Sequence, residues 1–276
     1  VVAGMGGSGA VGDIFSSILS KTNIHVTIVK GYLLPKTVDS KSLIITTSVS
    51  GNSVESLTIL ESAKKINCKI VAFASGGKME KYCKENKIEF RKINQIHSPR
   101  ASFTQFLFAM LKVLEPVLPL QKKDIEEAIN GLNELSKEIC SANLNNENLA
   151  VKIAKKIDGI PLIYYPSGLQ AAAIRFKNNL QENSKTHAII EDVIEACHNG
   201  VVAWEKTSNV TPILIIGNDD YIKTKERWNV LKEYFKLQKI NYQEIFSNGD
   251  GILSKLVNLI YLLDYASIYQ AILHKI

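Results

Sequence analysis

Short segments rich in β-branched and aromatic residues alternate with amphipathic segments along the first hundred residues. The apolar segments, whose composition is typical of strands, are residues 1–4, 25–32, 42–48, 69–75 and 88–93. The amphipathic segments, whose polar and apolar positions follow a helical period, are residues 12–22, 52–67 and 78–86. Because the strands are almost continuously apolar, we expect a parallel sheet that helices cover on both faces.

The middle of the chain is helical and separates two regions of this kind. Residues 101–118 and 123–140 have helical spacing, and a further helix ends near Asp158. From Gly159 the α/β pattern returns, with predicted strands at 160–168, 186–192, 212–220 and 242–246 and predicted helices at 169–184, 223–239 and 252–276. We therefore predict an α/β protein with two doubly wound parallel-sheet domains, residues 1–115 and 159–276, joined by a helical connection over residues 116–158.

Composition narrows the classes of protein that are compatible with the chain. The net charge of +6 is mild and its lysines are dispersed, which argues against a nucleic-acid partner. We see no signal peptide and no apolar run long enough to span a bilayer, and we expect a cytoplasmic protein with no membrane contact. None of the four cysteines forms a C-x-x-C pair, so we expect reduced thiols and no structural metal.

The loop after the first predicted strand has two interpretations. Gly4, Gly6 and Gly9 fall on the G-x-G-x-x-G spacing of dinucleotide-binding loops. Such a site needs a carboxylate about 20 residues further on, where this chain has Lys30. An NADP-dependent oxidoreductase stays open, because a cation suits the extra phosphate of that cofactor. The alternative is that Ser8, at the N-terminus of a helix, helps to line a site for a smaller anion.

The loop after the third predicted strand favours the smaller anion. Ser48, Ser50 and Ser53 lie within six residues, around Gly51 and Asn52, where the next helix begins. A helix cap needs one hydroxyl, whereas several hydroxyls together with free N–H groups form a cradle for phosphate. We predict that this loop binds a phosphate group.

The segments "GMGGS" and "SVSGNSVE" together resemble the sugar isomerase (SIS) domain. With "KGYLLP", "SPRASF", "FKNNLQENSKTHA", "CHNGVVAWE" and "LDYASIY", which follow in order over nearly the whole chain, they resemble the bifunctional phosphoglucose/phosphomannose isomerase family. The resemblance implies two SIS domains, a homodimer, and neither metal nor cofactor. It also implies interconversion of glucose 6-phosphate or mannose 6-phosphate with fructose 6-phosphate through a cis-enediol.

The resemblance further implies which residues bind the substrate and which react with it. The predicted substrate-binding residues are Gly7 and Ser8 beside the sugar and Ser48, Ser50 and Ser53 around the phosphate. Arg100 matches an arginine near the reacting carbons, Glu182 matches the catalytic base, and His198 matches a ring-opening histidine contributed by the partner subunit. The chemistry needs such a set: a carboxylate to move the proton, a cation beside the enediolate oxygen and a group that titrates near neutrality.

Two positions depart from the family pattern. After His198 and Asn199 relatives usually have glutamate, whereas this chain has Gly200 and lacks that carboxylate. In the C-terminal helix relatives often carry a threonine that is associated with mannose 6-phosphate. Here Ala266 or Ser267 takes that place, and only Ser267 supplies a hydroxyl for substrate binding.

Two other functions within the SIS fold remain alternatives. A non-catalytic sugar-phosphate sensor would keep the serine loop but would not need Glu182 and His198 in one pocket. An aminosugar isomerase would need a lysine near the C-terminus for a Schiff base, and Lys275 has no supporting motif.

Overall fold

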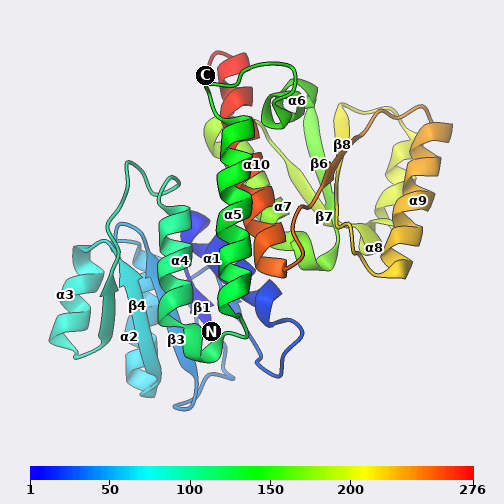
Figure 1. Cartoon of the computed structure of the whole chain (residues 1–276). Helices are drawn as coiled ribbons and strands as arrows, with labels where there is room; N and C mark the ends of the chain where they lie inside the picture. The colour runs from blue at the N-terminus through cyan, green and yellow to red at the C-terminus, as the bar shows by residue number, and fades with distance from the viewer. The chain divides into compact units, whose positions relative to one another are not determined.

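The computed structural model describes residues 1–276 and contains two compact units, Val1–Leu120 and Gln121–Ile276. We call them unit 1 and unit 2, and each carries one parallel sheet (Figure 1). The main helices found within the predicted connection are α5 (Lys122–Ile139) and α6 (Leu149–Lys156), and both belong to unit 2. An α/β protein with two parallel sheets is therefore confirmed.

The sheet of unit 1 has five parallel strands in the order β2-β1-β3-β4-β5. Their bounds are β1 (Val2–Ala3), β2 (Ile28–Val29), β3 (Leu43–Ser48), β4 (Lys69–Ala74) and β5 (Glu89–Lys92). In register, Val2 of β1 pairs with Ile28 on one side and Ile45 on the other. The strand order reverses at β1 and β3, and in open α/β sheets ligands bind beyond the carboxyl ends of the strands at such a point.

Helices cover both faces of this sheet. On one face lie α2 (Val54–Ile66), whose Ile59 packs near Ile44, and α3 (Gly77–Glu85). On the other lie α1 (Gly6–Leu19) and α4 (Phe103–Val113), where the Thr47 hydroxyl donates to Met110 Sδ at 3.5 Å. A 3₁₀ turn, η1 (Glu115–Val117), follows α4. The alternation of Ile44 and Thr47 between the faces is what a doubly wound sheet requires.

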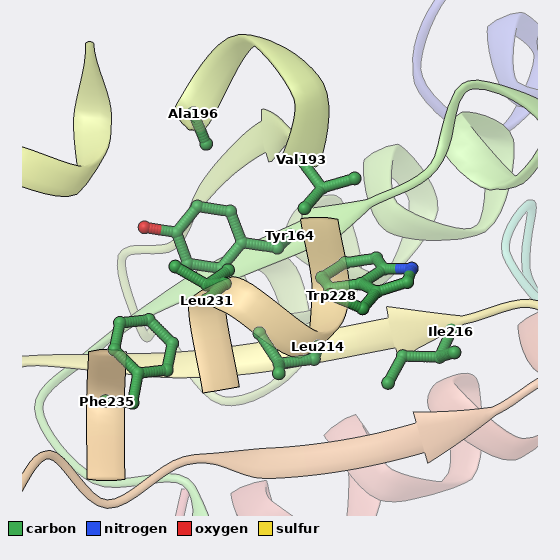
Figure 2. Close-up of a cluster of buried hydrophobic side chains, with 8 residues drawn as sticks. All are labelled: Tyr164, Val193, Ala196, Leu214, Ile216, Trp228, Leu231 and Phe235. Atoms are coloured by element: carbon green, nitrogen blue, oxygen red, sulfur yellow. The ribbon is translucent and has the colours of Figure 1, made fainter. Parts of the chain in front are cut away.

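The sheet of unit 2 has four parallel strands in the order β7-β6-β8-β9. Their bounds are β6 (Ile160–Tyr165), β7 (Ile189–Asp192), β8 (Val210–Ile216) and β9 (Gln243–Phe246). One face packs against α8 (Val193–Ala196) and α9 (Ile222–Leu237). Figure 2 shows the cluster formed there: Tyr164, Leu214 and Ile216 from the sheet, Val193 and Ala196 from α8, and Trp228, Leu231 and Phe235 from α9.

The C-terminal helix is the core helix of unit 2. This helix, α10 (Ile252–Leu273), packs against α5, α6 and α7 (Gln170–Asn183), and Figure 1 shows it beside α5. Two 3₁₀ segments, η2 (Ser167–Leu169) and η3 (Gly200–Glu205), complete the unit. By length and composition α10 could cross a membrane, so the expectation that no segment is long enough was wrong. However, 67% of its most apolar stretch is buried inside the protein, as in a soluble core helix.

Candidate active site

The first candidate residues lie where β1 ends and α1 begins. Helix α1 begins at Gly6, which has a φ of +53°, rather than at Gly12 as predicted. A β-carbon at Gly9 would lie 2.8 Å from the carbonyl oxygen of Gly4, so the chain folds closely over the first helical turn. Ser8 is buried in this turn and Gly7 is exposed beside it. The glycines are therefore explained by backbone packing, and Gly7 remains accessible to a ligand.

Lys30, which would bind the extra phosphate in the NADP hypothesis, forms an ion pair with Asp13 instead. Its Nζ lies 2.9 and 2.6 Å from the two carboxylate oxygens of Asp13 in α1. A β-carbon at Gly9 would lie 3.1 Å from Lys30 Cε, so the lysine stem crosses the first turns of α1. Burial raises the pKa of Asp13, and the ammonium group of Lys30 opposes that effect. The ion pair therefore argues against a dinucleotide at this loop.

The structure brings two of the three predicted phosphate-binding serines together. Ser48 is the last residue of β3, and its Oγ lies 2.9 Å from Ser53 Oγ. The N–H of Gly51 donates to Ser48 Oγ at 3.1 Å, which fixes the curve of the loop. Ser50 is exposed, and its hydroxyl accepts a hydrogen bond from the N–H of Asn52 at 3.3 Å. The loop thus gathers hydroxyl and N–H groups beyond the carboxyl end of β3.

The N-terminus of α2 is not capped by a side chain. Ser53 occupies the N-cap position, but its side chain accepts no hydrogen bond from the first turn of the helix. The unpaired N–H groups of a helix start attract anions, and the helix dipole adds to that attraction. The Oγ of Ser53 is shared with Ser48 instead of with the helix. This arrangement suits an incoming phosphate oxygen better than a purely structural cap does.

Gly76 and Gly77, which the sequence analysis did not single out, support the serine loop. Gly51 has a φ of +69°, and a β-carbon there would lie 1.8 Å from the carbonyl oxygen of Gly76. Gly77 has a φ of +73° and packs in the same way against the carbonyl oxygen of Ser50. The N–H of Lys78 donates to Asn52 Oδ1 at 3.1 Å. The turn after β4 therefore holds the loop after β3; the adjacent glycines that follow a strand were the available signal.

We expect Gly51→Ala to destabilise this loop and to weaken phosphate binding. The substitution forces a left-handed backbone on alanine and drives its methyl group into the main chain of Gly76, at a cost of about 2–4 kcal/mol. Urea unfolding and titration with inorganic phosphate would measure both effects. Gly31→Ala is the matched control, since nothing lies within 4 Å of its β-carbon position. Equal stability and phosphate affinity in the two variants would contradict this account.

Arg100 lies in the turn before α4 and is exposed. The predicted helix start immediately after Arg100 was wrong, because α4 begins at Phe103. Ser102, which is fully buried, holds the turn: its Oγ donates toward the carbonyl oxygens of Ile96 and Ser98 and accepts from the N–H of Ile96. Arg100 thus lies in a turn whose backbone is fixed.

Glu182 lies in the last turn of α7 and is exposed. The ammonium group of Lys185 donates to the main-chain carbonyl of Glu182 at 2.8 Å, which secures the helix end. The next residue, Asn183, donates from Nδ2 to Ser267 Oγ on α10 at 2.8 Å. Ser267 is fully buried and donates in turn to the carbonyl oxygen of Asp264 at 2.7 Å. Its hydroxyl therefore links α10 to the helix turn that carries Glu182.

A buried ion pair continues this link between α7 and α10. Arg175 is 3% exposed and forms hydrogen bonds from Nε and Nη2 to the carboxylate of Asp264, at 2.5–3.1 Å. Asn179 donates to the same carboxylate at 2.5 Å. Ser184 Oγ donates to Gln270 Oε1 at 2.7 Å beyond the end of α7. These polar contacts fix the position of the Glu182 turn against the core helix.

His198 lies in the exposed turn between α8 and η3. The main-chain N–H of His198 donates to the main-chain carbonyl oxygen of Glu195 at 2.9 Å. Asn199 Nδ2 donates to the carboxylate of Glu195 at 3.0 Å. The neighbouring thiol of Cys197 is poorly suited to nucleophilic chemistry, because burial raises its pKa. The turn therefore presents the imidazole rather than a Cys–His pair.

Known proteins resemble the chain over its whole length. A family model described as the bacterial phosphoglucose isomerase C-terminal SIS domain matches residues 146–276. A bifunctional phosphoglucose/phosphomannose isomerase of Caldicellulosiruptor bescii is 31% identical over 288 residues, which cover 100% of this chain and 84% of the relative. The chain belongs to the bifunctional phosphoglucose/phosphomannose isomerase family.

Other comparisons agree with membership of the phosphoglucose/phosphomannose isomerase family. A bifunctional phosphoglucose/phosphomannose isomerase of Aquifex aeolicus is 30% identical over 285 residues, which cover 99% of this chain and 84% of the relative. The structure of tagatose-6-phosphate ketose/aldose isomerase from Escherichia coli covers 99% of this chain and 81% of its own, with a TM-score of 0.77 and 13% identity, and so shares the fold. The resemblance inferred from the motifs is confirmed, and the protein is a sugar-phosphate isomerase of this family.

Proposed function

We propose that this protein interconverts glucose 6-phosphate and mannose 6-phosphate with fructose 6-phosphate. The observation that carries the proposal is the serine loop. Ser48 and Ser53 share a hydrogen bond beyond the carboxyl end of β3, beside a helix N-terminus that no side chain caps. Relatives that cover the whole chain are phosphoglucose/phosphomannose isomerases, which makes the substrate phosphate the natural ligand of this loop.

In this proposal the phosphate is bound by hydroxyl and N–H donors. In the proposed complex Ser48, Ser50 and Ser53 donate hydroxyl hydrogens to the phosphate oxygens, and the first N–H groups of α2 donate as well. Gly7 and Ser8 line the sugar. Binding energy from the phosphate then positions the reacting carbons, which lie at the other end of the substrate.

The proposed chemistry is a proton transfer between neighbouring carbons. Glu182 removes the proton from C2 of the open-chain aldose and returns it to C1, so that one carboxylate serves as base and then as acid. The hydroxyl proton of O2 passes to O1 in the same conversion. Arg100 stabilises the enediolate oxygen that forms in between. His198 carries the ring-oxygen proton during ring opening, and we propose that it does so for the partner subunit of a homodimer.

Mannose 6-phosphate is the more demanding substrate. Ser267, proposed from sequence as a substrate ligand, is buried and already hydrogen-bonded to Asn183 and to the main chain of Asp264. We propose that it acts through Asn183, the residue that follows Glu182 in the chain. Ala266 is also buried and supplies no hydroxyl. We therefore expect glucose 6-phosphate to be converted faster than mannose 6-phosphate.

The test is formation of fructose 6-phosphate from each aldose, measured separately and in the presence of EDTA. We expect turnover of both sugars to persist in EDTA, because every proposed acid, base and electrophile is a side chain. Binding of both sugars without turnover would refute the isomerase and favour a sugar-phosphate sensor. Stabilisation by NADPH but by neither sugar would favour the oxidoreductase.

A further inference from the structure

Gly200, the first residue of η3, lies directly against the carboxylate of Glu191. A β-carbon at position 200 would lie 2.8 Å from each of the two carboxylate oxygens. Glu191 belongs to β7, so a side chain from the sheet reaches the turn that carries His198. The missing side chain at position 200 is what leaves room for it. The carboxylate that the sequence lacks at position 200 is thus present in the fold, supplied by another element.

The same turn is held at two further points. Glu195 of α8 accepts hydrogen bonds from the main chain of His198 and from the side chain of Asn199. At the other end of η3, Trp204 Nε1 donates to the hydroxyl of Tyr164 at 2.9 Å. Tyr164 of β6 is the direct cross-strand neighbour of Glu191. Figure 2 shows its hydroxyl oxygen pointing away from the Trp228 ring.

The carboxylate of Glu191 is held there at an energetic cost. Burial raises its pKa, and the negative charge of Glu195 raises it further. The carboxylate of Glu191 forms no hydrogen bond or ion pair within the protein. In this it differs from the carboxylate of Asp13, which pairs with Lys30. A carboxylate in a partly buried position beside a functional turn is more typical of active sites than of surfaces.

We propose that Glu191 is a positioning residue for the isomerisation: its carboxylate fills the space that Gly200 leaves open and packs against the turn that carries His198. The inference rests on the proposed function, in which His198 assists ring opening. Because Glu191 does not bind the phosphate, its loss is expected to change kcat and to leave KM nearly unchanged. A displacement of the imidazole by about 1 Å is enough to slow turnover by roughly ten- to hundred-fold.

Substitutions at positions 191 and 200 can remove the carboxylate of Glu191, displace it, or place a carboxylate on the turn itself. Glu191→Ala removes the carboxylate and with it the contact with Gly200. Gly200→Ala keeps Glu191 but displaces its flexible carboxylate by a methyl group, at little cost in stability. We expect the same fall in kcat from either change, and no further fall when they are combined, because both abolish one contact. In the background of Glu191→Ala, Gly200→Glu places a carboxylate at the turn again and is expected to restore most of kcat.

The assay is glucose 6-phosphate isomerisation, with the melting temperature recorded for every variant. Glu205→Gln, an exposed change at the end of η3, is the control and is expected to match the wild type. Additive losses, a change in KM alone, or a Glu191→Ala/Gly200→Glu protein no better than Glu191→Ala would each overturn the positioning role. A wild type that does not isomerise the sugar would overturn the proposed function itself, and this inference with it.

Discussion

Glu182→Gln is expected to lower kcat for glucose 6-phosphate by about 10²–10⁴-fold, with KM little changed. The amide keeps the size and hydrogen-bonding capacity of the side chain but cannot accept the C2 proton. KM is preserved because the phosphate is assigned to the serine loop of unit 1. Steady-state kinetics measures the loss, and exchange of the C2 hydrogen with D₂O, followed by NMR, reports whether proton transfer itself has stopped.

The neighbourhood of Glu182 makes this variant interpretable. Glu182 is an exposed residue at the end of α7, so the substitution buries no group. Glu233→Gln on α9 is a matched control, since Glu233 is also an exposed helical glutamate of unit 2. If the Glu182 variant turned over and exchanged deuterium at the wild-type rate, another group would have to be the base.

Much of the fold could be predicted because its signals are local. The continuous apolar runs at β3, β4, β6 and β8 indicate buried parallel strands by composition alone. Edge strands were harder: the predicted strand at 25–32 is reduced to Ile28–Val29, because β1 offers only Val2 and Ala3 as pairing partners. The apolar sequence of one strand does not indicate how many residues of the adjacent strand are extended and available for pairing.

The candidate site divides in the same way. The serine loop was predictable because its hydroxyls lie within six residues. Its support by Gly76 was not, since that contact joins segments 25 residues apart in the chain. In the sequence, Gly200 indicated that a carboxylate was missing beside His198, whereas in the fold Glu191 places a carboxylate against Gly200. The Arg175–Asp264 pair, 89 positions apart, had no signal at all. Contacts of this kind depend on which helices pack together, and a sequence motif does not indicate that.

The Arg175–Asp264 pair leads to the largest expected effect on stability. Arg175→Met keeps most of the side-chain volume but leaves the carboxylate of Asp264 without its counter-ion, between α7 and α10. Removing one member of a fully buried pair costs about 3–5 kcal/mol. Because the Asp264 side chain is 23% exposed, we expect a loss near the lower end of that range in urea unfolding at pH 7. Lys122→Met is the matched control: Lys122 and Glu126 form an ion pair at 3.2 Å, but the lysine side chain is 90% exposed, and we expect at most about 0.5 kcal/mol.

The pH dependence of the same variant separates electrostatics from packing. Burial raises the pKa of Asp264, and Arg175 opposes that rise in the wild type. Without Arg175 the folded state takes up a proton at higher pH than the unfolded state does, so the stability of the variant falls as pH rises through that range. The deficit relative to the wild type should therefore shrink on acidification, and Arg175→Met/Asp264→Leu should recover much of it at pH 7. A deficit that is independent of pH and persists in the double variant would mean that the arginine stabilises unit 2 by packing alone, and that the Glu182 turn does not depend on the charge pair.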